Sequence, residues 1–387
     1  MEPVKIKENI HWVGAIDYDL RNFHGYLTEE GSTYNSYLIV DDKITLVDTV
    51  KENFADEMLE RISKIINPAK IDYVVTNHVE MDHSGSLDKV MEVAENATVI
   101  ISPKGRENLH IDYDEEWNFK TVTTGDQLNI GERNLDFILT PMVHWPDNMV
   151  TYSGDDKILF SNDAFGQHFA SSERFVDEVS CDIAIKEAKK YYANIVFPYS
   201  FQVENVLKKV VDLDIEVIAP SHGLIWRSFI TDIVEKYKWW VTKENKEKAV
   251  IIYDTMWDST EKIAYAIQNA FEAKGIDISM KNLDTNHISN IMTDILTAEY
   301  VCVGSPTLNN NMLPSVASFL TYLQGLIYGK KTGLAFGSYG WSGESIDHVA
   351  DLLEKSGFDL LDKIKVNYVP DENTLKEITN GLKKALD

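Results

Sequence analysis

The sequence contains only two cysteines, Cys181 and Cys302, and they do not form a spaced metal-binding motif. Each has apolar or helix-forming neighbours, so we expect two buried free thiols. No run of about 18 apolar residues is present, which excludes a membrane-spanning helix. The charged segment of residues 1–9 does not have the pattern of a signal peptide. Together these absences favour a cytoplasmic protein.

Basic side chains are scarce: 37 Lys and Arg stand against 62 Asp and Glu, which gives a formal net charge of −25. This balance argues against nucleic acid as a partner, because phosphates bind Lys and Arg. It favours solubility and would suit a partner with a basic face. The simpler alternative is an acidic surface that only contacts solvent.

The sequence has no internal repeat and no low-complexity segment, but its pattern changes near residue 248. A chain of 387 residues is too long for one ordinary core, which predicts two domains. In residues 1–247, strand pairs mix with helices, which predicts an α/β sandwich of two sheets covered by helices. Residues 229–248 should form a charged helical bridge. In residues 248–387, five strands alternate with five helices, which predicts a doubly wound parallel sheet.

The individual elements are predicted from apolar periodicity and turn residues. In the first domain, the predicted strands are 11–16, 33–40, 44–48, 71–76, 98–102, 127–130, 135–140, 149–153, 157–161 and 216–220, and the helices are 54–66, 182–194 and 201–213. In the second, the strands are 249–253, 277–282, 300–304, 332–336 and 363–369, and the helices are 261–274, 289–297, 314–326, 345–355 and 372–386.

The strongest chemical signal is a set of His, Asp and Glu residues that follow apolar strands. They are His78, Glu80, Asp82, His83, His144, Asp163 and His222. The first four lie within six residues, in a loop at the end of the strand 71–76. A loop on a rigid sheet can turn several side chains toward one centre. Two carboxylates packed so closely would repel each other without a cation, so the cluster predicts metal binding.

The number of these side chains suggests two metal ions. One ion would take His78, Glu80 and His144, the other would take Asp82, His83 and His222, and Asp163 would bridge them. A set of imidazoles and carboxylates without a thiolate suits iron or manganese, and zinc is also compatible. Two adjacent ions can clamp both ends of a small diatomic ligand or activate a water.

Three loops of the second domain predict a flavin site. Residues 254–260 form a hydroxyl-rich turn between a strand and a helix, which can surround a phosphate with backbone N–H groups. An ordinary helix N-cap at Ser259 or Thr260 is the simpler alternative. The loops 304–311 and 337–344 follow the third and fourth strands and would border the same crevice. Tyr339 or Trp341 could cover a flat ring, and no dinucleotide fingerprint of the Gly-x-Gly-x-x-Gly type is present.

The loop at residues 78–83 resembles the metallo-β-lactamase fold, whose hydrolases carry His-x-His-x-Asp-His. Here Glu80 replaces the second His, and this motif is similar to that of the flavodiiron proteins (A-type flavoproteins), whose later His, Asp and His also match. The resemblance covers essentially the whole chain, including the order of the domains. It implies an N-terminal metallo-β-lactamase-like αββα sandwich with two iron ions, and a C-terminal flavodoxin-like domain with FMN.

The resemblance also assigns roles to the flavin loops. Residues that would hold the FMN phosphate are Thr255, Met256, Trp257, Ser259 and Thr260. Residues that would hold the isoalloxazine are Ser305, Pro306, Thr307, Leu308, Asn309, Ser338, Tyr339, Gly340, Trp341, Ser342 and Gly343.

Several further residues are candidates for the surroundings of the metal ions. The residues that could line a substrate pocket are His24, His168, Tyr191 and Tyr192, for each of which an ordinary core or surface role is the alternative. Asp48 could orient a ligand imidazole. Trp145 and Pro146 would shape an apolar wall beside His144.

By resemblance, the protein would reduce dioxygen to water or nitric oxide to nitrous oxide, with FMN passing electrons to the iron pair. The external electron donor would be rubredoxin or a reduced deazaflavin. The family also implies a head-to-tail homodimer or a dimer of dimers. Two rival hypotheses are a metal-dependent hydrolase with an appended flavodoxin domain, and a redox carrier or sensor without catalytic activity.

Overall fold

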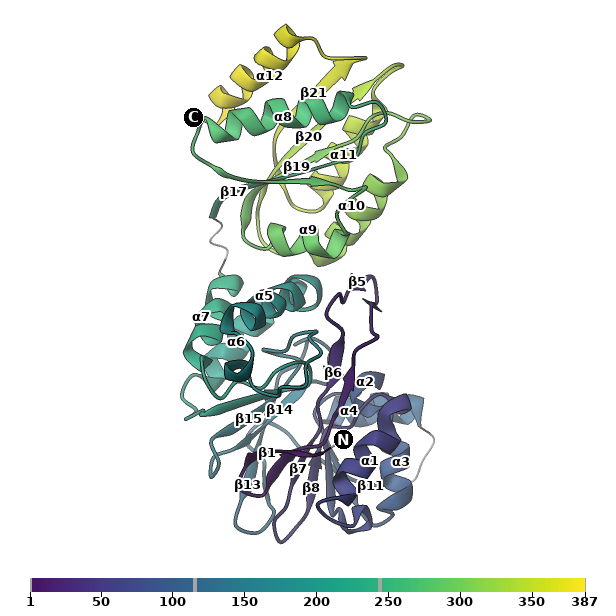
Figure 1. The fold of residues 1–387 in the computed structure, drawn as a ribbon, viewed down its shortest axis with the longest axis vertical. Helices are drawn as coiled ribbons and strands as arrows, with labels where there is room; N and C mark the ends of the chain where they lie inside the picture. Colours follow the sequence, from purple (N-terminus) through teal and green to yellow (C-terminus); the bar gives the residue numbers. More distant parts are fainter. Residues whose placement is uncertain (1, 114–116, 243–245, 387) are drawn as a thin grey trace. The chain divides into compact units, whose positions relative to one another are not determined.

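The computed structural model describes residues 2–113, 117–242 and 246–386 of the chain, which divide into two compact units (Figure 1). The first unit comprises the residues up to 24, then 28–191 and 199–238. The second comprises 25–27, 192–198 and the residues from 239 onward. Among the described residues, no helix is both long enough and apolar enough to cross a membrane.

The first unit contains two large sheets. The seven-stranded sheet has, in spatial order, β1 (Val4–Lys7), β2 (Ile10–Trp12), β7 (Tyr37–Ile39), β8 (Thr45–Val47), β9 (Tyr73–Thr76), β10 (Thr98–Ile101) and β11 (Asn118–Thr121). The five-stranded sheet has β12 (Gln127–Asn129), β13 (Asn134–Leu139), β14 (Met149–Ser153), β15 (Ile158–Asn162) and β16 (Val217–Pro220). A separate pair is formed by β3 (Ala15–Asp17) and β6 (Ser32–Tyr34).

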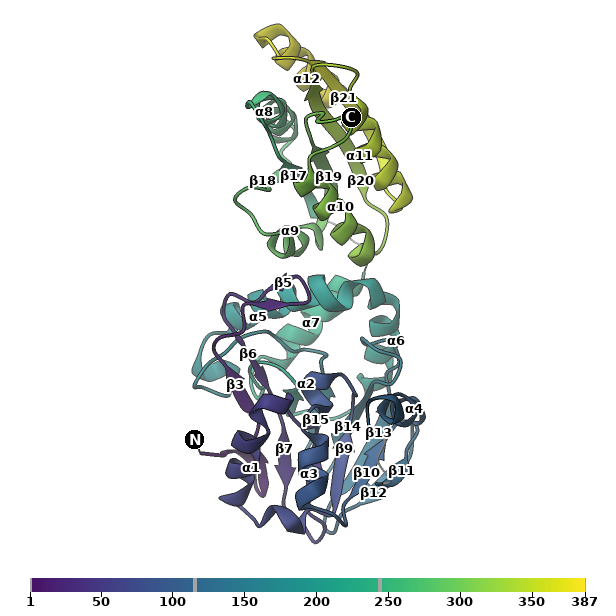
Figure 2. The ribbon, with the colours of Figure 1, turned by 90° about the vertical axis from the view of Figure 1, so that its right-hand side faces the viewer.

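The two sheets pack face to face around a shared core, and helices cover their outer faces (Figure 2). Val75 of β9 joins Phe137 and Phe160 of the other sheet in this core. Val74 points to the opposite face and packs with residues of α1 (Ala55–Ser63), α3 (Leu87–Val93) and α4 (Pro103–Asp112), because successive side chains of a strand alternate between faces. The outer face of the second sheet is covered by α6 (Ser200–Val210) and α7 (Ile230–Val241), whose residues lie against Leu159 and Ile218. The preceding helix α5 (Cys181–Tyr191) ends beside His222. The predicted αββα sandwich is confirmed.

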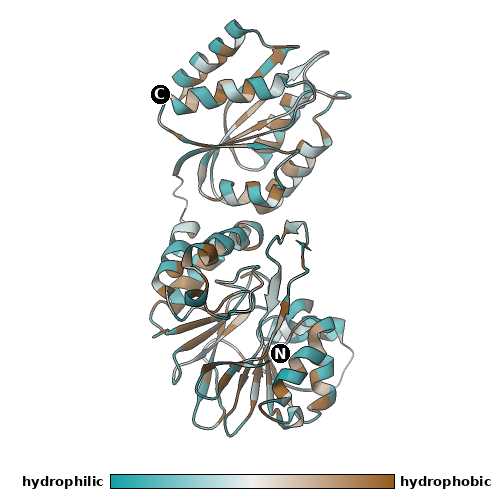
Figure 3. Ribbon diagram, in the orientation of Figure 1, coloured by the Kyte–Doolittle hydropathy of each residue, from teal (hydrophilic) through white to brown (hydrophobic). Residues whose placement is uncertain are grey.

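The second unit is a parallel sheet of five strands in the order β18-β17-β19-β20-β21. Its strands are β17 (Lys246–Tyr253), β18 (Asp277–Asn282), β19 (Ala298–Gly304), β20 (Thr332–Tyr339) and β21 (Asp359–Asn367). Its helices are α8 (Ser259–Glu272), α9 (Ile288–Ile295), α10 (Pro314–Leu326), α11 (Glu344–Lys355) and α12 (Glu372–Ala385). Apolar residues concentrate on the strands and on the sheet-facing sides of the helices (Figure 3). The predicted doubly wound sheet is confirmed.

Several predicted elements differ from the structure. The predicted strand 33–40 is two strands, because β6 pairs with β3 in a separate two-stranded sheet, whereas β7 belongs to the seven-stranded sheet. The predicted strand 11–16 is likewise divided into β2 and β3. The predicted helix 182–194 ends at Tyr191 and continues as a π-helical turn, Tyr192–Val196. Elements that were not predicted are β1, β4 (Asn22–Phe23), β5 (Tyr26–Leu27), α3, α4 and β11.

The predicted helical bridge over residues 229–248 is only partly correct. Helix α7 ends at Val241, and the charged residues from Lys246 to Lys248 begin strand β17 instead. Pairing with β18 and β19 places them in the sheet, and the Lys248 ammonium lies 2.6 Å from the Asp294 carboxylate. Residues 243–245 of the predicted bridge lie outside the described residues.

Both cysteines are free, but only Cys302 is buried. The prediction that Cys181 is also buried is wrong. Cys181 is the first residue of α5 and is half-buried there, because the first turn of a surface helix is partly open to solvent.

Lys331, immediately before β20, is a buried cation in the second unit. Its side chain is 5% exposed, and its Nζ donates to the carbonyl oxygen of Ala298 at 2.6 Å. Burial lowers the pKa of Lys331 from 10.5 to about 7, while Glu299 opposes this shift. Between pH 7 and 10 the unfolded chain therefore binds the proton more strongly than the folded chain does, so stability should rise with pH.

We expect the variant Lys331→Met to lack this pH dependence. From pH 7 to pH 10, the free energy of unfolding of the wild type should rise relative to that of the variant by on the order of a few kcal/mol. Urea denaturation of both proteins at each pH measures the difference. Lys330→Met is the matched control, because the Lys330 side chain is 83% exposed. Parallel pH profiles for the wild type and Lys331→Met would contradict the prediction.

Candidate metal centre

The seven predicted ligand residues all lie just beyond strand ends of the first unit. After β9, residues 77–80 form a turn, and the short helix α2 (Met81–Ser84) then carries Asp82 and His83, where the sequence predicted a loop. His144 lies between β13 and β14, while Asp163 follows β15 and His222 follows β16. The turn and α2 follow a strand of one sheet, whereas the other three positions follow strands of the second sheet. The cluster therefore lies where the two sheets meet.

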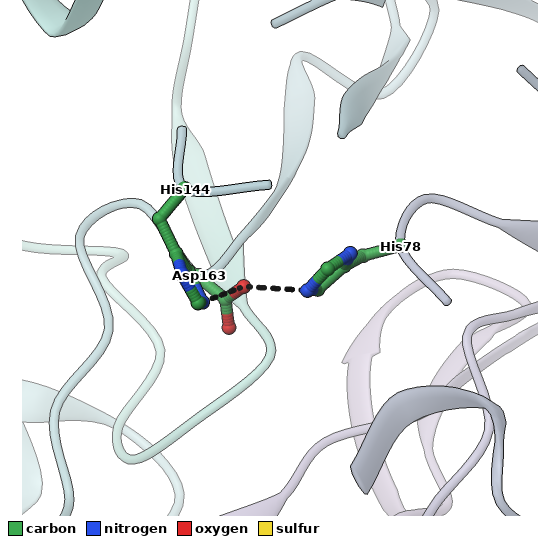
Figure 4. Close-up of side chains that lie close together, drawn as sticks. All are labelled: His78, His144 and Asp163. Atoms are coloured by element: carbon green, nitrogen blue, oxygen red, sulfur yellow. Dashed lines mark ion pairs between the residues drawn. The ribbon is translucent and has the colours of Figure 1, made fainter. Parts of the chain in front are cut away.

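His78, His144 and Asp163 form the first group, with ligand atoms that all lie within 4.8 Å of one another (Figure 4). The Asp163 Oδ2 lies 3.5 Å from the His144 Nε2 and 3.9 Å from the His78 Nε2. The Glu80 Oε2 faces the same two nitrogens, at 3.3 Å from His78 and 3.4 Å from His144. Two imidazole nitrogens and two carboxylate oxygens thus converge on one point.

Asp82, His83 and His222 form the second group, again within 4.8 Å. The Asp82 carboxylate lies 3.3 Å from the His83 Nε2 and 3.2 Å from the His222 Nε2. The other oxygen of Asp163, Oδ1, lies 3.1 Å from the His83 Nε2 and 3.5 Å from the His222 Nε2. The two oxygens of Asp163 therefore face two different groups.

The protein alone does not satisfy the polar atoms of this cluster. Both oxygens of Asp82, both oxygens of Asp163 and both ring nitrogens of His83 are buried, and no aligned hydrogen bond to the described residues satisfies them. Burying carboxylates without partners is costly. Four imidazoles and three carboxylates that point inward form a donor set that suits a pair of divalent cations.

In this cluster, burial of a side chain and the charges of its neighbours shift its pKa in opposite directions. Burial raises the pKa of Asp163, but the neighbouring imidazoles outweigh it and hold that pKa well below its ordinary value. Burial lowers the pKa of His83, but Asp82 and Asp163 outweigh it and raise the value to about 9. The site is thus built for compensating positive charge, which protons or metal ions can supply.

Hydrogen bonds on the far side of two imidazoles determine which nitrogen faces the cluster. The Nδ1 of His78 lies 3.0 Å from the Oδ2 of Asp147, which also accepts from the backbone N–H of Val79 at 2.9 Å. The Nδ1 of His222 donates to the carbonyl oxygen of Thr33 at 2.7 Å. Because a carbonyl oxygen can only accept, Nδ1 of His222 carries the hydrogen, and the Nε2 lone pair faces the cluster.

The sequence did not identify Asp147, and it proposed Asp48 for this orienting role instead. Asp48 is buried, but its carboxylate accepts from the backbone and side-chain N–H groups of Asn77, at 2.7 and 2.9 Å. Asp48 thus holds the start of the turn rather than an imidazole. Trp145, which was expected to form a wall, places its ring edge-on to His78 at 5.1 Å.

The four pocket candidates occupy different environments. The His24 Nε2 lies 3.6 Å from Glu80 Oε1, and its side chain is 77% exposed. His168 is buried, hydrogen-bonds Ser32 Oγ at 2.7 Å and lies 4.9 Å from the His222 ring. The Tyr191 ring is 5.9 Å from that of His222. The fourth candidate, Tyr192, belongs to the second unit, where its ring packs against Trp240.

The three predicted flavin loops lie together at the carboxyl ends of β17, β19 and β20, which are neighbours in the sheet. Strand β20 extends to Tyr339, beyond the predicted end at residue 336. The loops contact one another: Thr260 Oγ1 lies 3.4 Å from Ser338 Oγ, and the Thr307 N–H donates to the Ser338 carbonyl at 3.0 Å.

The first of these loops offers partners to an anion. The N-cap of α8 is Asp258 in a left-handed conformation, and it makes no side-chain capping bond. The hydroxyl of Thr255 is buried without a hydrogen-bond partner among the described residues. Ser259 starts α8 and Thr260 follows it, so the helix begins where the sequence predicted, but its N-cap residue is Asp258. Free N–H groups at a helix start and an unsatisfied hydroxyl fit a phosphate.

Comparisons with known proteins agree with this architecture. Residues 33–223 match a family described as ODP family beta lactamase, and residues 251–381 match the family Flavodoxin. The nitric oxide reductase of Moorella thermoacetica is 43% identical, over 93% of this chain and 92% of that protein. The rubredoxin-oxygen oxidoreductase of Megalodesulfovibrio gigas is 41% identical, over 100% of this chain and 98% of that protein.

A solved structure gives the same result. The crystal structure of the flavodiiron protein from Giardia intestinalis matches with a TM-score of 0.96 and 36% identity, over 100% of this chain and 96% of that one. The chain thus joins a β-lactamase-like domain to a flavodoxin-like domain, an arrangement that defines a class of metalloflavoproteins. It belongs to the flavodiiron protein family.

Proposed function

We propose that this protein is an oxidoreductase that reduces dioxygen to water, nitric oxide to nitrous oxide, or both, at a non-haem di-iron site supplied with electrons through FMN. The names of the relatives, a nitric oxide reductase and a rubredoxin-oxygen oxidoreductase, support both substrates. The observation that carries the proposal is the placement of Asp163, whose two oxygens face two separate groups of ligand atoms.

The proposed ligands divide between the two ions as the distances suggest. His78, Glu80 and His144 would hold one ion, Asp82, His83 and His222 would hold the other, and Asp163 would bridge them. A bound pair of iron ions would supply two adjacent redox-active positions for a diatomic gas. The protein positions the ligands: Asp147 and the Thr33 carbonyl orient two imidazoles, and Asp48 holds the turn before His78.

Residues beside the ligands would shape the pocket. His24 is exposed next to Glu80 and would line the open side of the first group. His168 and Tyr191 are buried beside His222 and would exclude water from that side. The proposed pocket therefore has one polar, open side and one closed, aromatic side.

In the second unit, residues 305–309 and 338–343 would hold the isoalloxazine, and the FMN phosphate would be held by Thr255, Met256, Trp257, Ser259 and Thr260. Bound FMN would accept electrons from a donor and release them one at a time. The unsatisfied Thr255 hydroxyl and the uncapped start of α8 support the phosphate position. With these sites, we propose a metal-binding domain of residues 1–247 and a flavin-binding domain of residues 248–387.

The external donor is proposed to be rubredoxin, because a relative is named a rubredoxin-oxygen oxidoreductase; a reduced deazaflavin is the alternative. We further propose a head-to-tail homodimer or a dimer of dimers. Trp257 and Trp341 of the flavin loops are 84% and 78% exposed, and exposed apolar surface of this kind favours association. The free cysteines favour a cytoplasmic location.

Metal and flavin quantitation on the purified protein, followed by gas consumption on an electrode, tests the proposal. We expect two irons and one FMN per chain, and consumption of dioxygen or nitric oxide by the anaerobically reduced protein. Two zinc ions with hydrolase turnover would support the hydrolase instead. Flavin reoxidation without gas consumption would support a redox carrier.

Removal of the Asp147 carboxylate should weaken metal binding. Asp147→Ala leaves the Nδ1 of His78 and the N–H of Val79 without their acceptor, and loss of such a partner typically costs about 10–100-fold in metal affinity. Asp147→Asn keeps an acceptor oxygen and should retain most of the affinity. Titration with ferrous iron under anaerobic conditions measures both. Equal affinities for the alanine variant and the wild type would show that Asp147 does not orient a ligand.

A further inference from the structure

A series of buried polar side chains connects three of the loops that carry the proposed ligands. The backbone N–H of Trp145 donates to the Asn148 Oδ1 at 2.7 Å, and the Asn148 Nδ2 donates to the Asn162 Oδ1 at 2.6 Å. The Asn162 Nδ2 then donates to the Ser221 Oγ at 3.1 Å. We call Asn148, Asn162 and Ser221 the polar chain. None of the three is more than 2% exposed.

The polar chain contacts each loop next to a proposed ligand. Trp145 directly follows His144, Asn162 directly precedes Asp163, and Ser221 directly precedes His222. The backbone reinforces one of these links, because the Ser221 N–H donates to the Asn162 carbonyl at 2.9 Å. A shift of one of these loops would therefore move a proposed ligand: His144 of the first ion, the bridging Asp163, or His222 of the second ion.

Asn162 is the central member, and its chemistry suits that place. Its amide accepts from Asn148 and donates to Ser221 at the same time, which a carboxylate or an aliphatic side chain of this size could not do. Its backbone has φ of 53°, in the left-handed region where Asn is tolerated better than most residues. Loss of the amide would leave buried polar partners unsatisfied on both sides.

The fourth ligand loop is tied to the same chain. Asn77 directly precedes His78, and its side-chain oxygen accepts from the Thr151 hydroxyl at 2.7 Å. Its carbonyl oxygen accepts from the N–H of Met149, the residue that follows Asn148, at 2.9 Å. All four loops that bear ligands are thus linked through one buried hydrogen-bonded layer.

We propose that Asn162 is a positioning residue that sets the spacing of the two metal positions by holding His144, Asp163 and His222 relative to one another. This inference rests on the ligand assignment given under the proposed function. Asn162 itself touches none of the reacting groups; it acts through the three loops.

The test is the affinity of the full-length protein for Co²⁺, which absorbs visible light when bound, after chelation of its metal. Asn162→Gly keeps the left-handed backbone accessible but lacks the amide. We expect it to bind both Co²⁺ ions about 10–100-fold more weakly and to show an altered absorption spectrum. Ser221→Ala removes only one end of the polar chain and should cause a smaller loss.

Asn9→Gly is the matched control, because Asn9 also has a left-handed backbone, with φ of 59°, but lies in an exposed turn between β1 and β2. It should bind Co²⁺ as the wild type does. A purely structural role for Asn162 would lower the melting temperature of the metal-free protein and leave the dissociation constants and the spectrum unchanged. That result would overturn the inference.

The outcomes also separate this inference from the proposed function. A wild-type protein that binds fewer than two Co²⁺ ions per chain would contradict the ligand assignment, and with it the role of Asn162. A wild-type protein that binds two ions, together with an Asn162→Gly variant of equal affinity and spectrum, would overturn the positioning role alone.

Discussion

Replacement of Asp163 by Ala is expected to reduce the iron content from two ions per chain to fewer than one, and gas reduction by at least about 100-fold. The reason is that both Asp163 oxygens face ligand nitrogens, Oδ2 toward His144 and Oδ1 toward His83, at 3.5 and 3.1 Å. Without the bridge, two cations would lie close together with less negative charge between them. Iron analysis after desalting and oxygen or nitric oxide electrode measurements record the two effects.

A second substitution at this position sharpens the test. Asp163→Asn keeps the shape of the side chain but offers only one oxygen, so it should load one ion more fully than the other. Asp212→Ala is the control, because Asp212 is an exposed residue after α6, and it should leave iron content and activity unchanged. Full iron occupancy in Asp163→Ala would show that the assignment of the bridge is wrong.

Replacement of Gly337 by Ala is expected to weaken flavin binding. A Cβ at this position would lie 1.9 Å from the carbonyl oxygen and 2.9 Å from the carbonyl carbon of Ser305, both backbone atoms of the neighbouring flavin loop. The loop would have to move, and overpacking of this kind costs about 1–3 kcal/mol, which corresponds to a loss of roughly 10–100-fold in affinity. Titration of the FMN-free protein with FMN, followed by flavin fluorescence, measures the change.

The matched control is Gly381→Ala, in helix α12 of the same unit. A Cβ there has no heavy atom within 4 Å. This variant should bind FMN normally and gain about 0.5–1 kcal/mol in the free energy of unfolding, because Ala is favoured over Gly inside a helix. An unchanged FMN affinity in Gly337→Ala would mean that the loops at 305–309 and 338–343 do not hold the flavin.

The sequence predicted the second unit well because each element there follows a simple pattern. Helix α10, Pro314–Leu326, was predicted with its observed ends, since Pro314 occupies the first helical position, where proline is favoured. In the region 86–121, β10 (Thr98–Ile101) was predicted, but α3, α4 and β11 were not. Helix α4 buries only Gly105 and Leu109, and β11 is a mostly exposed edge strand, so neither has clear apolar periodicity.

The candidate ligands could be predicted because each follows an apolar strand, and strand ends of a sandwich meet at an edge. Their partners could not. Asp147 contacts His78 from 69 positions away in the sequence, and Asn162 resembles an ordinary turn residue until its loop meets the others. The one available signal was a polar residue directly before three ligands, namely Asn77, Asn162 and Ser221.

The sequence also could not choose between Tyr191 and Tyr192. Adjacent residues of a helix point in directions about 100° apart, so only one of them can face His222. The structure shows that it is Tyr191, while Tyr192 starts the π-helical turn and packs on Trp240. Which of the two side chains faces His222 depends on where the regular helix ends, and here it ends in a π-helical turn that the sequence pattern does not indicate.

The proposed ligands come from both layers of the sandwich: His78 and Glu80 follow a strand of the seven-stranded sheet, while His144, Asp163 and His222 follow strands of the other. Bound iron would consequently connect the two sheets at one edge, and each bound ion would increase the free energy of unfolding. The metal-free domain would unfold more readily and would be degraded faster. A cell short of iron would then contain less of this protein, and the remaining protein would be less active.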